Sequence, residues 1–266
     1  MNVFTDFAAR LRAILVALAA DGVIGGIHLE GPFLSEARRG AHDPSVLRDP
    51  DASLVDELVS VCAAAGLARG IVQWTFAPER PGAEELVEAL VRHGIRPAVG
   101  HTDADADTVT RTLGAVANRQ GAPALVTHLF NGMPPFHHRA GGPVAAALTA
   151  AARGEAFVEL ITDGVHVSPD VVRMVFETVG PGAVVLVSDA MAATGLGDGS
   201  YTIGTLDVQV SGGTARLAGG GSIAGSTATL ADCVRWCVDV AGVPEADVLT
   251  SATSTPCSAV GLDLPS

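Results

Sequence analysis

The chain has 266 residues, of which 48% are hydrophobic and 17% are charged, and this composition excludes a mainly disordered chain. The net charge of −13 disfavours a nucleic-acid partner, because the surface would repel its phosphates. Asp or Arg residues interrupt every apolar stretch before it reaches bilayer-spanning length, so no membrane partner is expected. All 16 basic residues are arginine, which excludes chemistry that depends on a lysine.

The N-terminus and the cysteines both bear on the cellular compartment. An apolar run at 14–20 follows two arginines and loosely resembles a signal peptide. Asp6 argues against export, and the run fits an amphipathic helix equally well. No CxxC pair occurs among the cysteines, which are Cys62, Cys233, Cys237 and Cys257. We expect buried, reduced thiols and therefore a cytoplasmic protein.

A short apolar run, a polar or ionisable residue and a helical pattern recur in this order along the chain. The apolar runs predict strands at 23–30, 70–79, 95–101, 124–128, 157–163 and 183–189. The helical patterns lie at 51–65, 83–93, 104–118, 143–153 and 168–179. Near-continuous apolar runs are typical of parallel strands that are buried on both faces. The pattern predicts an α/β fold that resembles a TIM barrel, with about six of the eight βα units.

The chain after residue 200 follows a different pattern. Residues 201–217 alternate in polarity around Ser211-Gly212-Gly213, which predicts a small β-hairpin near 200–218. Two further helices are expected at 227–241 and 245–261. Because no low-complexity linker divides the chain, we predict a single, partial barrel domain over 1–266.

The predicted strands end in ionisable residues, which are Glu30, Glu79, His101, His128, Asp163 and Asp189. Active sites of parallel barrels lie at the carboxyl ends of the strands. One carboxylate and two imidazoles from different strands match a zinc or iron site with an open position, which suggests Glu30, His101 and His128. Asp189 would accept a proton from the attacking water and deliver it to a leaving amine. No role is assigned to Glu79.

Several motifs follow one another in an order that resembles a known enzyme family. They are HLEGP at 28–32, GAH at 40–42, GHT at 100–102, THLFN at 127–131, HHR at 137–139, DGVH at 163–166 and SDA at 188–190. From residue 24 to the C-terminus, the chain resembles the N-acetylglucosamine-6-phosphate deacetylases of the amidohydrolase superfamily. The resemblance implies a metal-dependent hydrolase of amino-sugar catabolism, which splits the acetamide of this sugar phosphate into acetate and glucosamine 6-phosphate.

The resemblance also implies roles for the matching positions. Glu30, His101 and His128 would bind one divalent metal ion, which is Zn²⁺ or alternatively Fe²⁺. Asp189 would be the general base and acid, and His42 would polarise the acetamide carbonyl. The sugar-phosphate contacts would come from Ala41, His42, Asn131, Gly132, Arg139, His166, Ile223, Ala224 and Gly225. The resemblance further implies a homodimer in which Arg139 reaches the phosphate in the neighbouring site.

The match with the family breaks at both ends of the chain. The family's β-sandwich and its first barrel strands have no counterpart, which predicts one metal per chain and a sheet with two open edges. Gly132 stands where many relatives have alanine, and we expect little effect from this change. Two alternatives stay open. One is another amidohydrolase, such as a deaminase or a cyclic amidase, and the other is a truncated remnant without catalytic activity.

Overall fold

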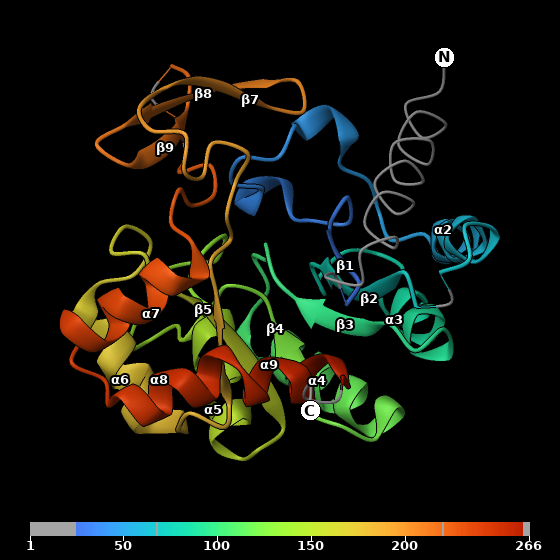
Figure 1. The fold of residues 1–266 in the computed structure, drawn as a ribbon. Coiled ribbons are helices and arrows are strands. Elements are labelled where there is room, and N and C mark those ends of the chain that lie inside the picture. The colour runs from blue at the N-terminus through green and yellow to red at the C-terminus, as the bar shows by residue number, and fades with distance from the viewer. Residues whose placement is uncertain (1–24, 68, 220, 263–266) are drawn as a thin grey trace.

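Six parallel strands form one sheet whose spatial order follows the sequence (Figure 1). The computed structural model describes residues 25–67, 69–219 and 221–262, so the apolar run at 14–20 lies outside the described residues. The strands are β1 (Ile27–Glu30), β2 (Ile71–Phe76), β3 (Arg96–Val99), β4 (Ala124–Val126), β5 (Ala156–Ile161) and β6 (Val184–Val187). The prediction of six βα units is confirmed. Within the described chain, β1 pairs only with β2 and β6 only with β5, so the sheet does not close.

Five helices alternate with these strands and pack on one face of the sheet. They are α2 (Ala52–Ala64), α3 (Ala83–Arg92), α4 (Ala106–Gln120), α5 (Gly142–Ala152) and α6 (Pro169–Val179). Aspartates cap two of them, because the Asp51 and Asp105 side chains accept hydrogen bonds from backbone N–H groups of the first turn. These bonds help to place the helix starts near the predicted positions.

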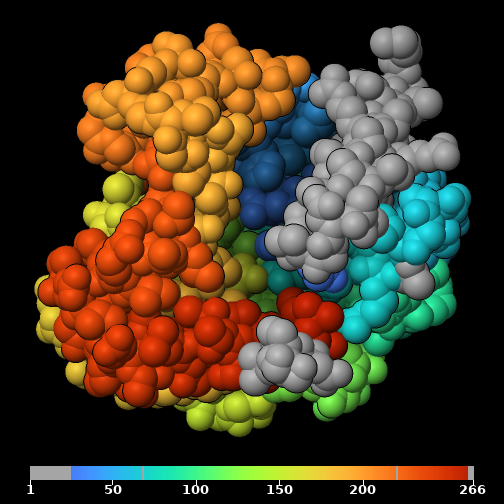
Figure 2. Space-filling model, in the orientation of Figure 1, coloured from blue at the N-terminus to red at the C-terminus, as the bar shows by residue number. Residues whose placement is uncertain are grey.

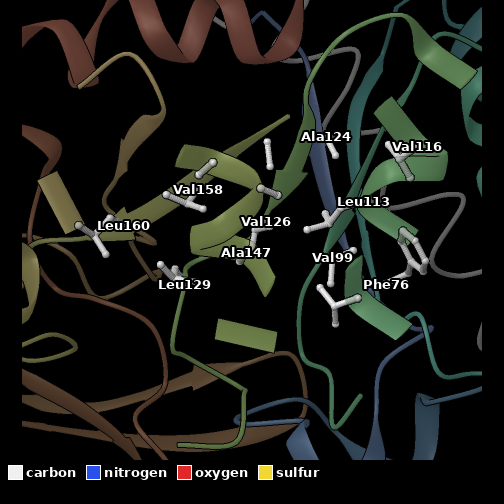
Figure 3. Packing of buried hydrophobic residues seen from close by; sticks show 14 of the residues in the cluster. Phe76, Val99, Leu113, Val116, Ala124, Val126, Leu129, Ala147, Val158 and Leu160 are labelled. Carbon is white, nitrogen blue, oxygen red and sulfur yellow. The ribbon is translucent and has the colours of Figure 1, made fainter. Parts of the chain in front are cut away.

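The main core lies between the strands and these helices, as Figure 3 shows for its central part. Strand residues meet residues of α4 and α5 there, and none of the following is more than 1% exposed: Phe76, Val99, Leu113, Val116, Val126, Ala147, Val158 and Leu160. Burial of such side chains stabilises the fold by about 1.5–3 kcal/mol each relative to exposure. This core holds the strands in register and so fixes where their carboxyl ends lie.

The opposite face of the sheet changes character along the strands. Ala98, Leu125 and Val185 form a small apolar cluster with Ala259, which belongs to α9 (Ser254–Val260). Toward the carboxyl ends the buried side chains become polar: the Thr75 and Thr127 hydroxyl oxygens lie 2.6 Å apart. The inner face therefore becomes polar as it approaches the edge where the ionisable residues lie.

The helical region at the end of the chain differs from the prediction. It contains α7 (Leu230–Asp239), α8 (Glu245–Ala252) and α9, so the single helix expected at 245–261 is wrong. Thr253 leaves the helical conformation with φ −130° and ψ −79°. Pro256 explains the break, because it has no N–H for the carbonyl of Ala252 and its ring would clash with that carbonyl.

The region near 200–218, where a hairpin was predicted, forms a three-stranded antiparallel sheet. Its strands are β7 (Gly199–Ile203), β8 (Leu206–Ser211) and β9 (Thr214–Leu217). The turn at 211–213 is confirmed, whereas the sequence prediction missed the turn at Gly204-Thr205. The Thr205 hydroxyl donates a hydrogen bond to the Asp43 carboxylate over 2.8 Å. This contact ties the small sheet to the segment that follows β1.

Three of the four cysteines are buried and one is partly exposed. Cys62, Cys233 and Cys237 lie in the core, and Cys257 lies on α9. Burial raises the pKa of Cys233 to about 11 and that of Cys237 to about 12, so both stay protonated thiols near neutral pH. Among the helices described, none has the length and apolar content that a bilayer-spanning segment requires.

Candidate active site

A cavity of about 600 Å³ lies between the carboxyl edge of the six-stranded sheet and the small β7–β9 sheet. Figure 2 shows a recess between this orange sheet and the blue segment that follows β1. The cavity is lined by every predicted site residue except Arg139: Glu30, Ala41, His42, His101, His128, Asn131, Gly132, His166, Asp189, Ile223, Ala224 and Gly225. Residues that are up to 195 positions apart thus meet, because parallel strands end at one edge and the 223–225 loop returns to the turn after β6.

The three predicted metal ligands converge on one point of this cavity. The Glu30 carboxylate lies 2.7 Å from His101 Nε2 and 3.4 Å from His128 Nε2. The two imidazole Nε2 atoms are 3.1 Å apart. His42 joins them from the loop after β1, with its Nε2 2.7 Å from Glu30 Oε1. The potential ligand atoms of Glu30, His42 and His101 all lie within 4.8 Å of one another, so His42 is a further candidate donor.

The hydrogen bonds around His101 show that this cluster fits a metal cation. His101 Nδ1 lies 2.6 Å from the Arg38 carbonyl oxygen, which can only accept, so Nδ1 carries a proton. In the neutral ring, Nε2 then has a free lone pair, which faces the Glu30 carboxylate and the His128 imidazole. Such a group of lone pairs needs a positive charge at its centre, and one carboxylate with imidazoles is a common donor set for zinc.

The pKa values of the cluster point in the same direction. Burial raises the pKa of Glu30, but hydrogen bonds with His101 and His128 outweigh this effect and leave the pKa well below its usual value. Burial lowers the pKa of His128, but the hydrogen bond with Glu30 and its negative charge outweigh this effect and raise the pKa to about 9. The cluster therefore attracts positive charge, and a metal ion would have to displace a proton in order to bind.

Asp189 follows β6 and opens onto the same cavity. Its surroundings raise its pKa, chiefly by desolvation, with a smaller contribution from the negative charge of Glu30. His128 and His166 act against this rise. A raised pKa suits a carboxylate that must both accept and return a proton near neutral pH.

The backbone is strained where the strands enter the site. Among the described residues, all non-glycine residues with a left-handed backbone lie in this region: His101 (φ 46°), His128 (φ 28°), Phe130 (φ 78°) and Asp189 (φ 48°). Such conformations cost about 1–3 kcal/mol each and persist only where the surrounding structure enforces them. The strained turns aim the functional side chains of β3, β4 and β6 into the cavity.

The loop after β4 brings its backbone close to His101. The Asn131 amide group donates to the carbonyls of His128 and Leu129, so this side chain is used inside its own loop. Gly132 has φ 60°, and a Cβ atom there would lie 2.6 Å from His101 Nδ1. An alanine here would therefore require the His101 ring or the loop to shift, whereas the glycine fits this close approach; the expectation that the glycine has little effect stays a prediction.

Arg139 lies apart from the cavity that the other predicted residues form. It is exposed, and its guanidinium lies 2.8 Å from the neighbouring His138 Nε2. The chain's own cavity therefore receives no contact from Arg139. Arg38 lines the cavity instead, but it is engaged with Asp103 over 2.7 Å.

Sequence reasoning missed one supporting carboxylate, Glu159, and assigned no role to another, Glu79. Glu159 is 5% exposed, and it accepts hydrogen bonds from the Gln73 amide at 2.6 Å and from the His128 N–H at 3.4 Å. A charged residue inside the apolar run of β5 was the signal for it. Glu79 accepts from the Thr102 hydroxyl at 2.6 Å and from the Asp103 N–H at 2.7 Å. Both residues hold the loops that carry the histidines.

A parallel sheet in this order, with a carboxylate and imidazoles gathered at its carboxyl edge, is the architecture expected of the amidohydrolase fold. The comparisons with known proteins find relatives of one named family. The chain is homologous to the N-acetylglucosamine-6-phosphate deacetylases over about 91% of its length, and the resemblance predicted from the sequence is confirmed. No family model matches the chain.

The relatives come from animals and bacteria. The chain is 37% identical to the deacetylase of Bos taurus over 245 residues, which are 91% of this chain and 57% of the relative. It is 34% identical to that of Vibrio furnissii over 261 residues, 96% of this chain and 61% of the relative. An N-acetylgalactosamine-6-phosphate deacetylase of Escherichia coli O157:H7 is 35% identical over 238 residues, 90% of this chain and 59% of that protein.

Solved structures of the same family share the fold. One is a mutant of the Mycobacterium smegmatis enzyme in complex with N-acetyl-D-glucosamine-6-phosphate; it is 39% identical, with a TM-score of 0.86 over 98% of this chain and 65% of that one. The enzyme from Thermotoga maritima is 30% identical, with a TM-score of 0.79 over 96% of this chain and 66% of that one. The chain thus spans less than two thirds of the length of these relatives.

Proposed function

We propose that the chain hydrolyses the acetamide of N-acetylglucosamine 6-phosphate to acetate and glucosamine 6-phosphate. The observation that carries this proposal is the meeting of Glu30, His101, His128 and Asp189 at one cavity in a homologue of these deacetylases.

Glu30, His101 and His128 would hold one divalent metal ion per chain. Zn²⁺ suits this donor set, and Fe²⁺ is the alternative, since both bind imidazole and carboxylate ligands. When bound, the ion supplies Lewis-acid polarisation of the acetamide carbonyl and lowers the pKa of a nearby water. The two histidines are more than nine-tenths buried, which supports them as ligands over the more exposed His42.

The chain's own residues perform the proton transfers. Asp189 accepts the proton of the attacking water and then donates it to the nitrogen of the leaving amine. His42 donates a hydrogen bond to the acetamide oxygen, where negative charge develops. Its bond to Glu30 holds the ring at the cavity wall until substrate binds.

The rest of the cavity binds the sugar phosphate. His166, Ala41, the Asn131-Gly132 backbone and the 223–225 loop contact the sugar. The phosphate requires strong donors, and arginine provides a permanent charge with bidentate geometry. We propose that Arg139 provides them across a homodimer, because it is exposed and does not line its own cavity. The enzyme would act in the cytoplasm.

Acetate release by the purified chain, measured together with its metal content, tests the proposal. Asp189→Asn is expected to lower turnover by about 10²–10⁴-fold while the metal stays bound. Because the pKa of Asp189 is raised, kcat/KM should decline with falling pH above the usual aspartate range near 3.9. Asp198→Asn, in an exposed turn outside the site, is the control. Near-normal activity of Asp189→Asn would refute this role.

The E. coli O157:H7 relative supports a second candidate substrate, N-acetylgalactosamine 6-phosphate. The two sugars differ only at one hydroxyl group, so their kcat/KM values should be compared in the same assay. Deaminase and cyclic amidase substrates belong in the same panel, since both reactions suit the same metal chemistry. Activity on one of those alone would replace the proposed reaction, and no activity on any of them would favour a remnant without catalysis.

A further inference from the structure

Asp163 is a buried carboxylate that the proposed reaction does not use. It lies two residues after β5, and its side chain is 4% exposed. Oδ1 accepts hydrogen bonds from the N–H groups of Val165 and His166, each at 2.9 Å. Oδ2 accepts from His166 Nδ1 and from the Ser226 hydroxyl, each at 2.8 Å. Burial raises the pKa of Asp163, but the bonds with His166 outweigh it and hold the pKa well below its usual range, so the carboxylate is ionised.

The first consequence concerns the imidazole of His166. An ionised carboxylate can only accept, so His166 Nδ1 carries the proton. Nε2 has no hydrogen-bond partner in the described part of the chain, and His166 lines the cavity. Asp163 thus fixes both the orientation of the ring and the tautomer that it presents to a ligand, as carboxylates do for functional histidines.

The second consequence concerns Asp189, which the same carboxylate reaches through Ser226. The Ser226 N–H donates to the Asp189 carbonyl at 2.8 Å, and the Ser226 carbonyl accepts from the Met191 N–H at 2.8 Å. Ser226 is 2% exposed. The preceding Gly225 has φ 70°, and a Cβ there would lie 3.1 Å from the Asp189 carbonyl oxygen, which shows how closely the two segments approach.

We propose that Asp163 is a positioning residue that joins the His166 loop, the 223–226 loop and the turn of Asp189 into one unit. The inference rests on the proposed function. His166 contacts the sugar and Asp189 moves the proton, so their relative placement decides whether a bound acetamide faces the base. The left-handed φ of 48° at Asp189 needs such support, because an unsupported turn would relax out of this conformation.

A merely structural carboxylate would close its own turn and do nothing more. The two bonds from Oδ1 to backbone N–H groups fit that simpler role, and Asp198 makes the same kind of contact with Gly212 and Gly213 on the surface. The bonds of Oδ2 do not fit it, because they go to two side chains from separate segments of the cavity wall. The test must therefore separate the function of Oδ2 from that of Oδ1.

Two substitutions and one control make this separation. Asp163→Asn keeps the shape of the side chain and one acceptor oxygen. Its amide N–H₂ group then faces either the His166 ring or the backbone N–H groups of Val165 and His166. Ser226→Ala keeps the carboxylate, its bond with His166 and the backbone bonds to the Asp189 turn. It removes the hydroxyl that joins Asp163 to this loop and that also accepts from the Ala228 N–H at 3.1 Å. Asp198→Asn removes a carboxylate that accepts two backbone bonds outside the cavity. Each is assayed for kcat and KM as the metal-loaded full chain, with ¹⁵N NMR of the histidine rings.

The expected results differ between the variants. Asp163→Asn should lower kcat/KM on the order of 10- to 100-fold, with a raised KM, and should move the His166 proton from Nδ1 to Nε2. Ser226→Ala should lower kcat with KM and the His166 tautomer unchanged. The double variant should be no worse than Asp163→Asn alone, because both changes break one link. Asp198→Asn should match the unsubstituted chain.

The proposal is overturned if Asp163→Asn keeps the Nδ1 proton and stays within twofold of the control. If Asp163→Asn does not fold, Ser226→Ala decides alone, since unchanged kcat there would remove the link to Asp189. If the unsubstituted chain has no deacetylase activity, the proposed function fails. The His166 tautomer of the two variants, measured with glucosamine 6-phosphate as the probe ligand, then decides whether Asp163 orients the ring.

Discussion

The carboxyl edge of the six-stranded sheet and the helix-covered face of the same strands are built in opposite ways. On the covered face, Val126 and Leu160 are fully buried among other apolar groups in ordinary backbone conformations. At the edge, His101 and His128 are almost as deeply buried, but they are polar and their backbones are left-handed. Two regions separated by a few residues along each strand thus follow different rules.

The difference shows how the chain uses its stability. Apolar burial is favourable wherever the side chains fit, so the covered face needs no particular partner for each residue. A buried imidazole needs a specific partner, and a left-handed turn needs a surrounding structure that enforces it. Burial in the core therefore stabilises the fold, and this stability offsets the cost of holding the cluster around Glu30 at the edge. Substitutions in the two regions should have separable effects on stability and activity.

The largest effect is expected at the edge, from Glu30→Gln. The amide removes the carboxylate that contacts His101 and His128, so these imidazoles lose the nearest negative charge that attracts a cation. Metal content should fall from one ion per chain toward zero, and activity should fall about 10³-fold or more, since Lewis-acid chemistry is worth several kcal/mol. Elemental analysis and acetate release measure the two quantities.

The control for this change is Glu177→Gln, which alters an exposed glutamate of α6. It should leave metal content and activity unchanged. Full metal occupancy in Glu30→Gln would contradict the assignment and point to His42 as a ligand that compensates.

The opposite result is expected in the core, from Leu113→Ala in α4. Leu113 is 1% exposed, and truncation leaves a cavity between the helix and the strands. Unfolding should become easier by about 2–5 kcal/mol, as urea titration would measure. Metal content and kcat of the folded fraction should stay near their original values. Leu249→Ala, at a position that is 46% exposed in α8, is the matched control and should cost well under 1 kcal/mol.

A loss of metal in Leu113→Ala under native conditions would break the comparison, because it would mean that the edge and the core do not behave as separate regions. The placement of the two regions on opposite sides of the strands argues against such a loss. Leu113 packs on the outer side of the strands, whereas the cluster around Glu30 faces the cavity.

The alternation of apolar runs and helical patterns was enough to predict the six strands and the helices α2 to α6. The end of β1 was predicted correctly, whereas β2 to β6 were predicted to end two or three residues too late, because each apolar run continues into the turn that follows the strand. His101 and Asp189, for example, lie two residues beyond the ends of β3 and β6. Periodicity detects side-chain burial, and burial continues past the end of the regular strand.

The residues that support the site through contacts with other side chains could not be predicted from such patterns. Strand ends and family motifs pointed to twelve of the residues that line the cavity, yet Asp163 also binds Ser226, which lies 63 positions away. No local pattern encodes such a pairing, because it depends on how two loops approach in space. The same limit applies to Glu159, whose charge inside an apolar strand was visible but whose partners were not.

The smallest effect is expected from Glu79→Gln, which tests how far the strained edge depends on its outer supports. Glu79 is an exposed residue, and it holds the Thr102 hydroxyl and the Asp103 N–H directly behind His101. An amide can accept only one of these bonds well, so unfolding should become easier by about 1 kcal/mol or less. Metal affinity should fall by at most about tenfold, the lower end for residues outside the ligand sphere. Competition with a coloured chelator measures that affinity, with Glu177→Gln as the reference.

A loss of metal as complete as in Glu30→Gln would mean that the turn at His101 has no other support, although the Ser35 N–H also donates to the His101 carbonyl at 3.0 Å. An affinity identical to the reference would instead mean that this second bond and the Arg38 carbonyl suffice to hold the ring, and that the exposed carboxylate does not contribute to the site.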